Sequence, residues 1–166
     1  MRNDSESATS QTTAHLLLVA ITVILAILLL LSFHLPNFEW GHTEPPVIFK
    51  IVSISSTAPT FESHIFLKNI VKKDYENKEL SAKIYCNDAL LPCTILTLNT
   101  HDFISTAHYG IKNFKGQGGT GELWNYNQLL RMDLSNGFIH PGDIIRVDII
   151  QTATDTVISR DSMKAP

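Results

Sequence analysis

Two histidines and an aspartate, His101, Asp102 and His108, come close together in the segment HDFISTAHYG. Imidazole and carboxylate groups ligate metal ions and transfer protons, so this segment is a natural place to look for chemistry. On a strand, His101 and His108 would point to opposite faces. The sequence has no Cys-x-x-Cys or His-x-x-x-His pair and no third ligand close to this segment. We therefore predict structural roles for these residues, with no metal site and no cofactor.

The segment from Lys115 to Gly121, KGQGGTG, is rich in glycine, and glycine-rich loops can hold phosphate groups. It lacks the Gly-Lys-Ser/Thr ending of a phosphate-binding loop and the strand-loop-helix setting that such loops need. We predict a flexible connection between strands, followed by Trp124, which packs on the domain or covers its edge.

Nucleophilic and acid-base catalysis also lack a sequence signature. No Gly-x-Ser-x-Gly elbow is present. Asp143 and Asp148 alternate with the apolar residues of one predicted strand, which predicts that both carboxylates face solvent. We predict that the protein is not an enzyme.

Cys86 and Cys93 flank a predicted hairpin connection, YCNDALLPCT. Asn87, Asp88 and Pro92 supply residues typical of turns. If the two cysteines face each other across the hairpin, in a domain outside the cell, they could form a disulfide. Two free thiols are the alternative.

The elements that must position these residues begin with an apolar segment. From Ala14 to Phe33 the chain has no charged side chain, and only Thr22 interrupts the run from Leu16 to Leu31. Twenty helical residues span roughly 30 Å, the thickness of the hydrocarbon core of a bilayer. A threonine hydroxyl can bond to a carbonyl one turn earlier, so Thr22 is tolerated. This segment predicts a membrane-spanning helix.

The chain then divides into four predicted parts: a polar leader (1–13), the transmembrane helix (14–35), a proline-rich linker (36–46) and an extracellular domain (47–166). Phe38 and Trp40 follow the helix where aromatic side chains anchor at a membrane interface. We expect a single-pass protein of the cell membrane, in contact with lipid, with the short N-terminus inside and the C-terminal domain outside.

Short, β-branched segments bounded by turn residues fill the C-terminal part. In the clearest example, Leu80, Ala82, Ile84 and Cys86 share one face of a strand. The pattern predicts an all-β domain, an antiparallel, immunoglobulin-like β-sandwich of about seven strands. The predicted strands are 47–55, 64–70, 80–86, 93–99, 129–134, 143–151 and 156–160.

The charge of the chain argues against nucleic acid as a partner. Thirteen Lys and Arg residues against 16 Asp and Glu residues leave a net charge of −3. Phosphate-backbone binding needs a basic footprint.

The N-terminal part resembles a known family. Ser7-Ala8-Thr9-Ser10, followed by the run from Leu16 to Ala26, is similar to the N-terminal module of archaeal type IV pilins. Stretches at 97–99, 101–104, 141–143 and 146–148 resemble β domains of pilin-like proteins. The resemblance implies a helix that enters the membrane and then forms the core of a surface filament, with a β domain exposed for adhesion or subunit contacts. The helix residues concerned are Leu16, Leu17, Leu18, Val19, Ala20, Ile21, Thr22, Val23, Ile24, Leu25 and Ala26.

The implied partners are other pilin subunits, the pilus assembly machinery and a prepilin peptidase. Where the family usually has Pro-Val-Ile-Gly, this chain has Gln11-Thr12-Thr13-Ala14, and no basic-plus-small peptidase site precedes it. A permanently membrane-anchored β-sandwich that acts as a binding module of the cell envelope is therefore the alternative.

Overall fold

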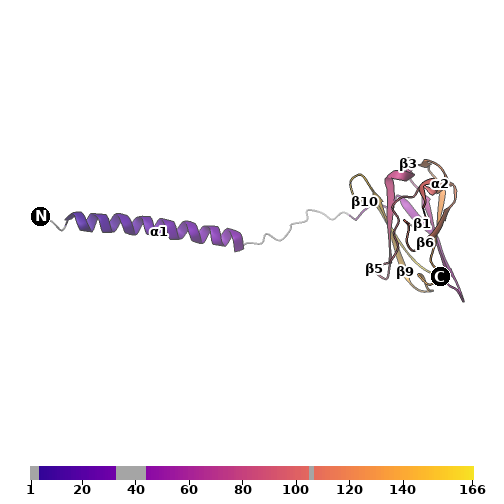
Figure 1. Cartoon of the computed structure of the whole chain (residues 1–166), viewed down its shortest axis with the longest axis horizontal. Helices are drawn as coiled ribbons and strands as arrows, with labels where there is room; N and C mark the ends of the chain where they lie inside the picture. Colours follow the sequence, from indigo (N-terminus) through magenta and orange to yellow (C-terminus); the bar gives the residue numbers. More distant parts are fainter. Residues whose placement is uncertain (1–3, 33–43, 105–106) are drawn as a thin grey trace. The chain divides into compact units, whose positions relative to one another are not determined.

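The computed structural model describes residues 4–32, 44–104 and 107–166 (Figure 1). The chain divides into two compact units, 1–42 and 43–166, which we describe one at a time. Most of the predicted linker, residues 36–43, lies outside the described residues.

The first unit contains the helix α1, which runs from Asp4 to Ser32. The helix thus begins ten residues before Ala14, within the predicted leader. Helix growth is favourable once a stable helical segment exists, so the polar residues extend the apolar helix. Residues 11–29 form the one helix in the described part of the chain that is long and apolar enough to cross a membrane.

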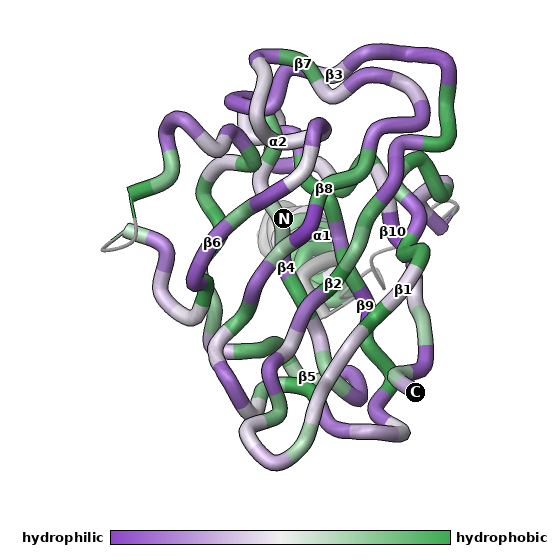
Figure 2. The backbone as a smooth tube through the Cα atoms, turned by 90° about the vertical axis from the view of Figure 1, so that its right-hand side faces the viewer, coloured by the Kyte–Doolittle hydropathy of each residue, from purple (hydrophilic) through white to green (hydrophobic). Residues whose placement is uncertain are grey.

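The second unit is an antiparallel sandwich, as predicted, with ten strands instead of about seven. The first sheet has the order β1 (Phe49–Thr57), β2 (Glu62–Asn69), β8 (Leu129–Leu134), β6 (Ile111–Lys115). The second has the order β10 (Thr156–Lys164), β9 (Ile144–Gln151), β4 (Leu80–Cys86), β5 (Ala89–Leu90). A ribbon of β3 (Tyr75–Glu76) and β7 (Leu123–Trp124) lies at one end of the sandwich (Figure 2). Three short helices complete the unit: η1 (Asn77–Glu79), η2 (Thr100–Asp102) and α2 (Gln117–Thr120).

The core lies between the two sheets, where alternate side chains of each strand point inward. Ile65 and Leu67 of β2 meet Ile84 of β4 and Val147 of β9 in one buried cluster. Burial of each such side chain contributes about 1.5–3 kcal/mol. The predicted inward face of β4 is confirmed for Leu80, Ala82 and Ile84, which are all buried, and Cys86 is half-buried.

Side chains of β10 join the two sheets at one edge of the sandwich. The hydroxyl oxygen of Ser159 accepts hydrogen bonds from the backbone N–H groups of Ile48 and Phe49, both at 3.0 Å. One carboxylate oxygen of Asp161 accepts the N–H of Ile51 at 2.7 Å. Edge strands expose unpaired N–H groups that attract other chains, and these bonds satisfy two of them on β1 and a third just before it.

The predicted strand 93–99 is wrong. Only an isolated bridge joins Ile95 to Ala82, and the segment belongs to a connection between β5 and β6. Its buried apolar residues, Ile95 and Leu98, are spaced by three instead of two.

The sequence analysis missed β6 for a related reason. A bulge between Ile111 and Asn113 places the two buried apolar side chains of β6, Ile111 and Phe114, three residues apart. The bulge hides the alternation of period two that marks a strand.

Candidate functional site

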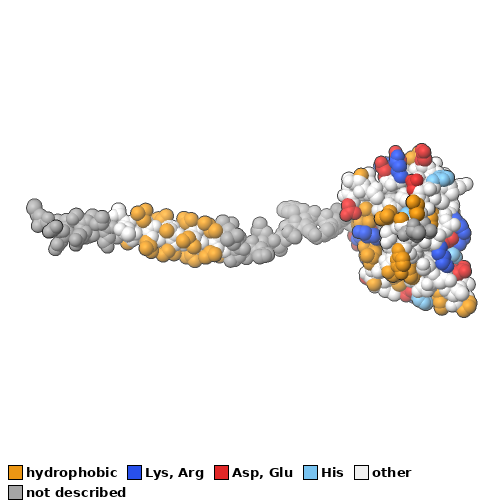
Figure 3. All heavy atoms as spheres, in the orientation of Figure 1, with side chains coloured by type: hydrophobic (Ala, Val, Ile, Leu, Met, Phe, Trp, Pro, Cys, Tyr) orange, Lys and Arg blue, Asp and Glu red, His pale blue; other side chains and the backbone are white. Residues whose placement is uncertain are grey.

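The apolar surface of α1 is uncovered in the first unit. Every residue from 11 to 29 is exposed, and the large apolar side chains from Leu16 to Leu29 are 48–71 % exposed. Figure 3 shows hydrophobic side chains along the described part of this helix. All eleven predicted assembly residues, 16–26, therefore present their side chains outward. Such a surface can contact only lipid or other apolar surfaces favourably.

The polar side chains of α1 bond within the helix. The Thr22 hydroxyl donates to the Val19 carbonyl at 2.8 Å, as predicted. A ring nitrogen of His15 lies 2.9 Å from the Gln11 carbonyl oxygen. Neither residue requires a partner from outside the helix.

His101 and His108 do not lie on strands. His108 is buried against Phe103, with ring centroids 4.7 Å apart, and one ring nitrogen lies 3.0 Å from the Ile104 carbonyl oxygen. His101 is exposed in η2, where its Nε2 lies 2.8 Å from the Thr120 carbonyl oxygen. The described residues contain no group of three His, Cys, Asp or Glu side chains that could hold a metal ion.

The glycine-rich segment from Lys115 to Gly121 is an ordered and packed part of the domain. The prediction of a flexible connection is therefore wrong. Lys115 ends β6, and α2 follows with Gly118 and Gly119 buried. A Cβ atom on Gly118 would lie 2.4 Å from Nε1 of Trp124. Gly118 is therefore needed for close approach of the backbone to Trp124, and Gly119 for close approach to Leu130 and Thr100. The predicted packing of Trp124 is confirmed, because its side chain is fully buried with its ring 4.3 Å from that of Phe49.

Cys86 and Cys93 are both free thiols in the structure. The register explains this result. Cys86 lies opposite Ala89, whereas the Cys93 thiol forms a hydrogen bond with the backbone of Ile84. Burial raises the pKa of Cys93 to about 11. Burial and a hydrogen bond with Asp143 raise the pKa of Cys86.

Asp148 does not face solvent, contrary to prediction: it is 1 % exposed. Lys83 of β4 and Arg160 of β10 are its cross-strand partners, and Arg160 forms an ion pair with it. Asp143 is half-buried and holds a turn, because its carboxylate accepts hydrogen bonds from the His140 N–H and the Asn87 side chain. These bonds lower the pKa of Asp143. Both aspartates stabilise local structure.

A positively charged surface covers the outer side of the first sheet. We call it the cationic face and define it by five side chains that point away from the core. These are Lys50 of β1, Lys68 of β2, Lys112 and Lys115 of β6, and Arg131 of β8.

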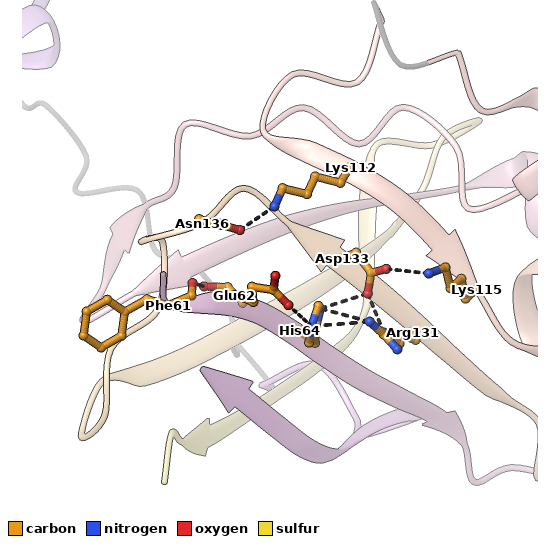
Figure 4. A network of polar contacts seen from close by, with 9 residues as sticks. Phe61, Glu62, His64, Lys112, Lys115, Arg131, Asp133 and Asn136 are labelled. Atoms are coloured by element: carbon orange, nitrogen blue, oxygen red, sulfur yellow. Dashed lines mark hydrogen bonds and ion pairs between the residues drawn. The ribbon is translucent and has the colours of Figure 1, made fainter. Parts of the chain in front are cut away.

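Asp133 is the central acceptor on this face (Figure 4). Its Oδ1 lies 2.9 Å from Nδ1 of His64 and accepts a hydrogen bond from Nε of Arg131. Its Oδ2 lies 3.4 Å from the ammonium nitrogen of Lys115. The opposite side of the His64 ring faces Glu62, with Nε2 3.8 Å from the carboxylate. One nearly buried carboxylate thus serves three nitrogen-bearing side chains.

Sequence reasoning missed the cationic face. Its residues come from four strands that span more than 80 positions, from 50 to 131. The alternation within β2 could have placed His64 and Lys68 on its outer side. Only the pairing of β2 with β8 brings Asp133 opposite His64.

A hollow of about 590 Å³ lies at the end of the sandwich that carries β3 and β7. It is lined mainly by polar side chains, three of them carboxylates. Lys78 pairs with Glu76 at 3.1 Å, and Asn99 donates to Asp102 at 2.7 Å. The lining residues are Glu76, Lys78, Asn99, His101, Asp102, Glu122 and Leu123.

No protein-family model and no curated protein matches this chain. Two solved structures resemble it. The archaellum periplasmic stator protein FlaG from Sulfolobus acidocaldarius is 9 % identical, with a TM-score of 0.41 over 69 % of this chain and 97 % of that one. The complex of the stator proteins FlaF and FlaG from the same organism contains a chain that is 8 % identical, with a TM-score of 0.42 over 70 % of this chain and 89 % of that one. TM-scores this low establish neither the fold nor the role of this chain.

Proposed function

We propose that the protein is a pilin-like subunit of an archaeal type IV pilus-type surface filament. One observation carries the proposal: α1 has apolar side chains on all sides from 16 to 29 and leaves them uncovered, while the β unit has a complete core of its own. A chain built in this way needs an apolar environment for its helix and places a folded domain in water. The resemblance of residues 16–26 to archaeal pilins supports the same function.

The chemistry of the helix suits two successive environments. Lipid tails and the interior of a helix bundle are nearly equally apolar, so close packing decides between them. The subunit would first insert into the membrane as a single-pass protein. The assembly machinery would then transfer its helix into the filament core, after a prepilin peptidase removes the leader. There, residues 16–26 would contact neighbouring subunits.

The β unit would form the filament surface and act by binding instead of catalysis. Its hydrophobic cluster lies between its own two sheets. Its outer surfaces carry the cationic face and the hollow lined by Glu76, Asp102 and Glu122. Both are available for adhesion or subunit contacts.

Intact mass and the N-terminal residue test this function directly. We would measure both on protein from the native cell envelope and on filaments sheared from the cells. The expected result is protein in the sheared fraction with a new N-terminus between Asn3 and His15. Protein that keeps Met1 and stays in the membrane fraction would instead identify the permanent anchor.

Crosslinking of the helix provides a second test. In the Leu18→Cys variant, neighbouring helices in a filament should form disulfide-linked dimers under mild oxidation. The wild-type chain, which has only Cys86 and Cys93, is the matched control. It should form no disulfide-linked dimers, because the raised pKa values of both thiols leave little reactive thiolate. Absence of dimers in the variant would contradict helix packing between subunits.

A further inference from the structure

Like charges face each other across strands of the cationic face. Lys50 of β1 lies directly opposite Lys68 of β2, and Lys115 of β6 lies directly opposite Arg131 of β8. Like charges at directly opposed positions destabilise an antiparallel pair. Two such pairs on one sheet face therefore work against the stability of the isolated domain.

The carboxylates on this face do not neutralise it. Glu62 and Asp133 oppose five Lys and Arg side chains, which leaves an excess of three positive charges on a chain whose net charge is −3. Asp133 lies next to Arg131 and Lys115. Lys50 and Lys68 form no ion pair within the described part of the chain. Lys112 also forms no ion pair there, and its ammonium group donates a hydrogen bond to the neutral Asn136 side chain, so the unbalanced charge lies on these three lysines.

An aromatic side chain lies among these cations. Phe66 is half-buried on the outer side of β2, between His64 and Lys68, and the Arg131 guanidinium lies 5.7 Å from its ring centroid. At this distance the guanidinium is attracted to the face of the ring. Aromatic and arginine side chains are enriched at protein–protein interfaces, whereas isolated surface lysines are not.

The complementary charge is present on the same chain. Glu76, Asp102 and Glu122 are exposed and line the hollow at the end of the sandwich, together with Lys78. Glu79 is also exposed and lines a neighbouring hollow with Glu76 and Lys73. Figure 3 shows acidic side chains at the upper end of the domain and Lys and Arg side chains at its right-hand edge. We call the region that carries Glu76, Glu79, Asp102 and Glu122 the acidic end.

The acidic end and the cationic face belong to different sides of one rigid sandwich, so they cannot meet within one chain. Figure 2 shows β3 and β7 above the strands that carry the cationic face. Contact between them requires a second copy. A head-to-side contact of this kind uses a different surface on each copy, so it repeats from copy to copy and extends into a filament when it does not close into a ring.

We infer that the cationic face of one subunit binds the acidic end of a second copy of the same chain. The inference rests on the proposed function, because filament assembly brings the domains together. Lys50 and Lys68 would contact the carboxylates of Glu76 and Glu122, which would remove the repulsion between the lysines.

The test uses the full chain in neutral detergent micelles and measures self-association by sedimentation velocity. We expect association at about 50 mM salt that weakens at least tenfold at about 500 mM, because screening shortens the range of charge interactions. Charge reversal in K50E/K68E or in E76K/E122K should each weaken association at least tenfold. An equal mixture of the two variants should restore it, since each then offers a face complementary to the other.

The K50E/K68E variant should fold as wild type does, because it keeps two like charges opposite each other and changes only their sign. Lys164→Glu, an exposed position of β10 opposite the uncharged Ile144, changes the net charge outside both surfaces and should leave association unchanged. Association driven by α1 alone would survive high salt and all reversals. That result would overturn this inference and leave the proposed function standing.

Two further outcomes would also overturn the inference. The first is loss of association in K50E/K68E without loss in E76K/E122K, which would exclude the acidic end as the partner. The second is salt-sensitive binding of soluble poly-glutamate through Lys50 and Lys68 by a chain that shows no salt-sensitive self-association. That result would assign the cationic face to a foreign anionic partner.

Discussion

Arg160 of β10 holds Asp148 of β9 through two parallel hydrogen bonds, at 2.8 Å from Nε to Oδ1 and 2.7 Å from Nη2 to Oδ2. The two residues are directly opposite in the register. The Asp148 side chain is 2 % exposed and that of Arg160 is 36 % exposed. The carboxylate therefore depends on its partner, whereas the guanidinium also reaches water.

This asymmetry predicts unequal effects of the two single substitutions. Arg160→Met should destabilise the domain by about 2–3 kcal/mol, because it leaves a buried charge without its main partner. Asp148→Leu should cost less, and the double variant should lie within about 1 kcal/mol of wild type. Urea unfolding of the full chain in neutral detergent, followed by tryptophan fluorescence, measures all three. A double variant less stable than Arg160→Met would contradict this account.

Gly118 is predicted to tolerate no side chain. Gly118→Ala would force a Cβ atom against the indole of Trp124 and should destabilise the domain by about 1–3 kcal/mol. Gly121→Ala is the matched control, since the nearest atom to its Cβ would be 3.7 Å away, and should change stability by less than about 0.5 kcal/mol. Urea unfolding curves of the two variants and of wild type give both values. Equal effects in the two variants would show that the contact with Trp124 is unimportant.

From the lowered pKa of Asp143 we predict that the domain loses stability at acid pH. Its pKa is lowered in the folded state by hydrogen bonds from the His140 N–H and from Asn87. Its stabilisation is therefore present above the unfolded-state pKa and is lost as the pH falls through the folded-state pKa. Asp143→Asn should be less stable than wild type at pH 7, and the difference should shrink as the pH falls from about 5 to 2. Unfolding free energies across this range measure the effect.

Asn87→Ala serves as the comparison for this pH dependence, because it removes one of the donors to Asp143 and leaves the His140 N–H in place. It should reduce the dependence on pH without abolishing it. A difference between wild type and Asp143→Asn that stays constant from neutral to acid pH would rule out the proposed linkage.

The free thiols predict a simple labelling result. Without reductant, denatured protein should take up two iodoacetamide adducts, since Cys86 and Cys93 are free. Native protein at about pH 8 should react slowly at Cys93, because a pKa of about 11 leaves only about one thiolate in a thousand. Intact mass before and after unfolding gives both results. Denatured protein without adducts would show that the two cysteines form a disulfide.

The sequence predicted several features of the β unit through local patterns. The alternation of Leu80, Ala82 and Ile84 placed β4 correctly, because a half-buried strand leaves a period of two in the chain. The same rule failed at β6, where a bulge separates Ile111 from Phe114 by three positions. It also failed at Asp148, because the alternation indicates which side of a sheet a residue occupies and carries no information about whether neighbouring strands cover that side.

The sequence alone determined the apolar helix and the all-β class of the second unit. The uncharged run from Ala14 to Phe33 is favourable only in an apolar environment. Short β-branched segments favour strands that pair into sheets. Only the tertiary structure decided which charges meet. Lys50 opposes Lys68, and Asp133 opposes His64, because the strand order and register set these neighbours. Pairing between distant strands depends on the packing of the whole core, so no local pattern encodes it.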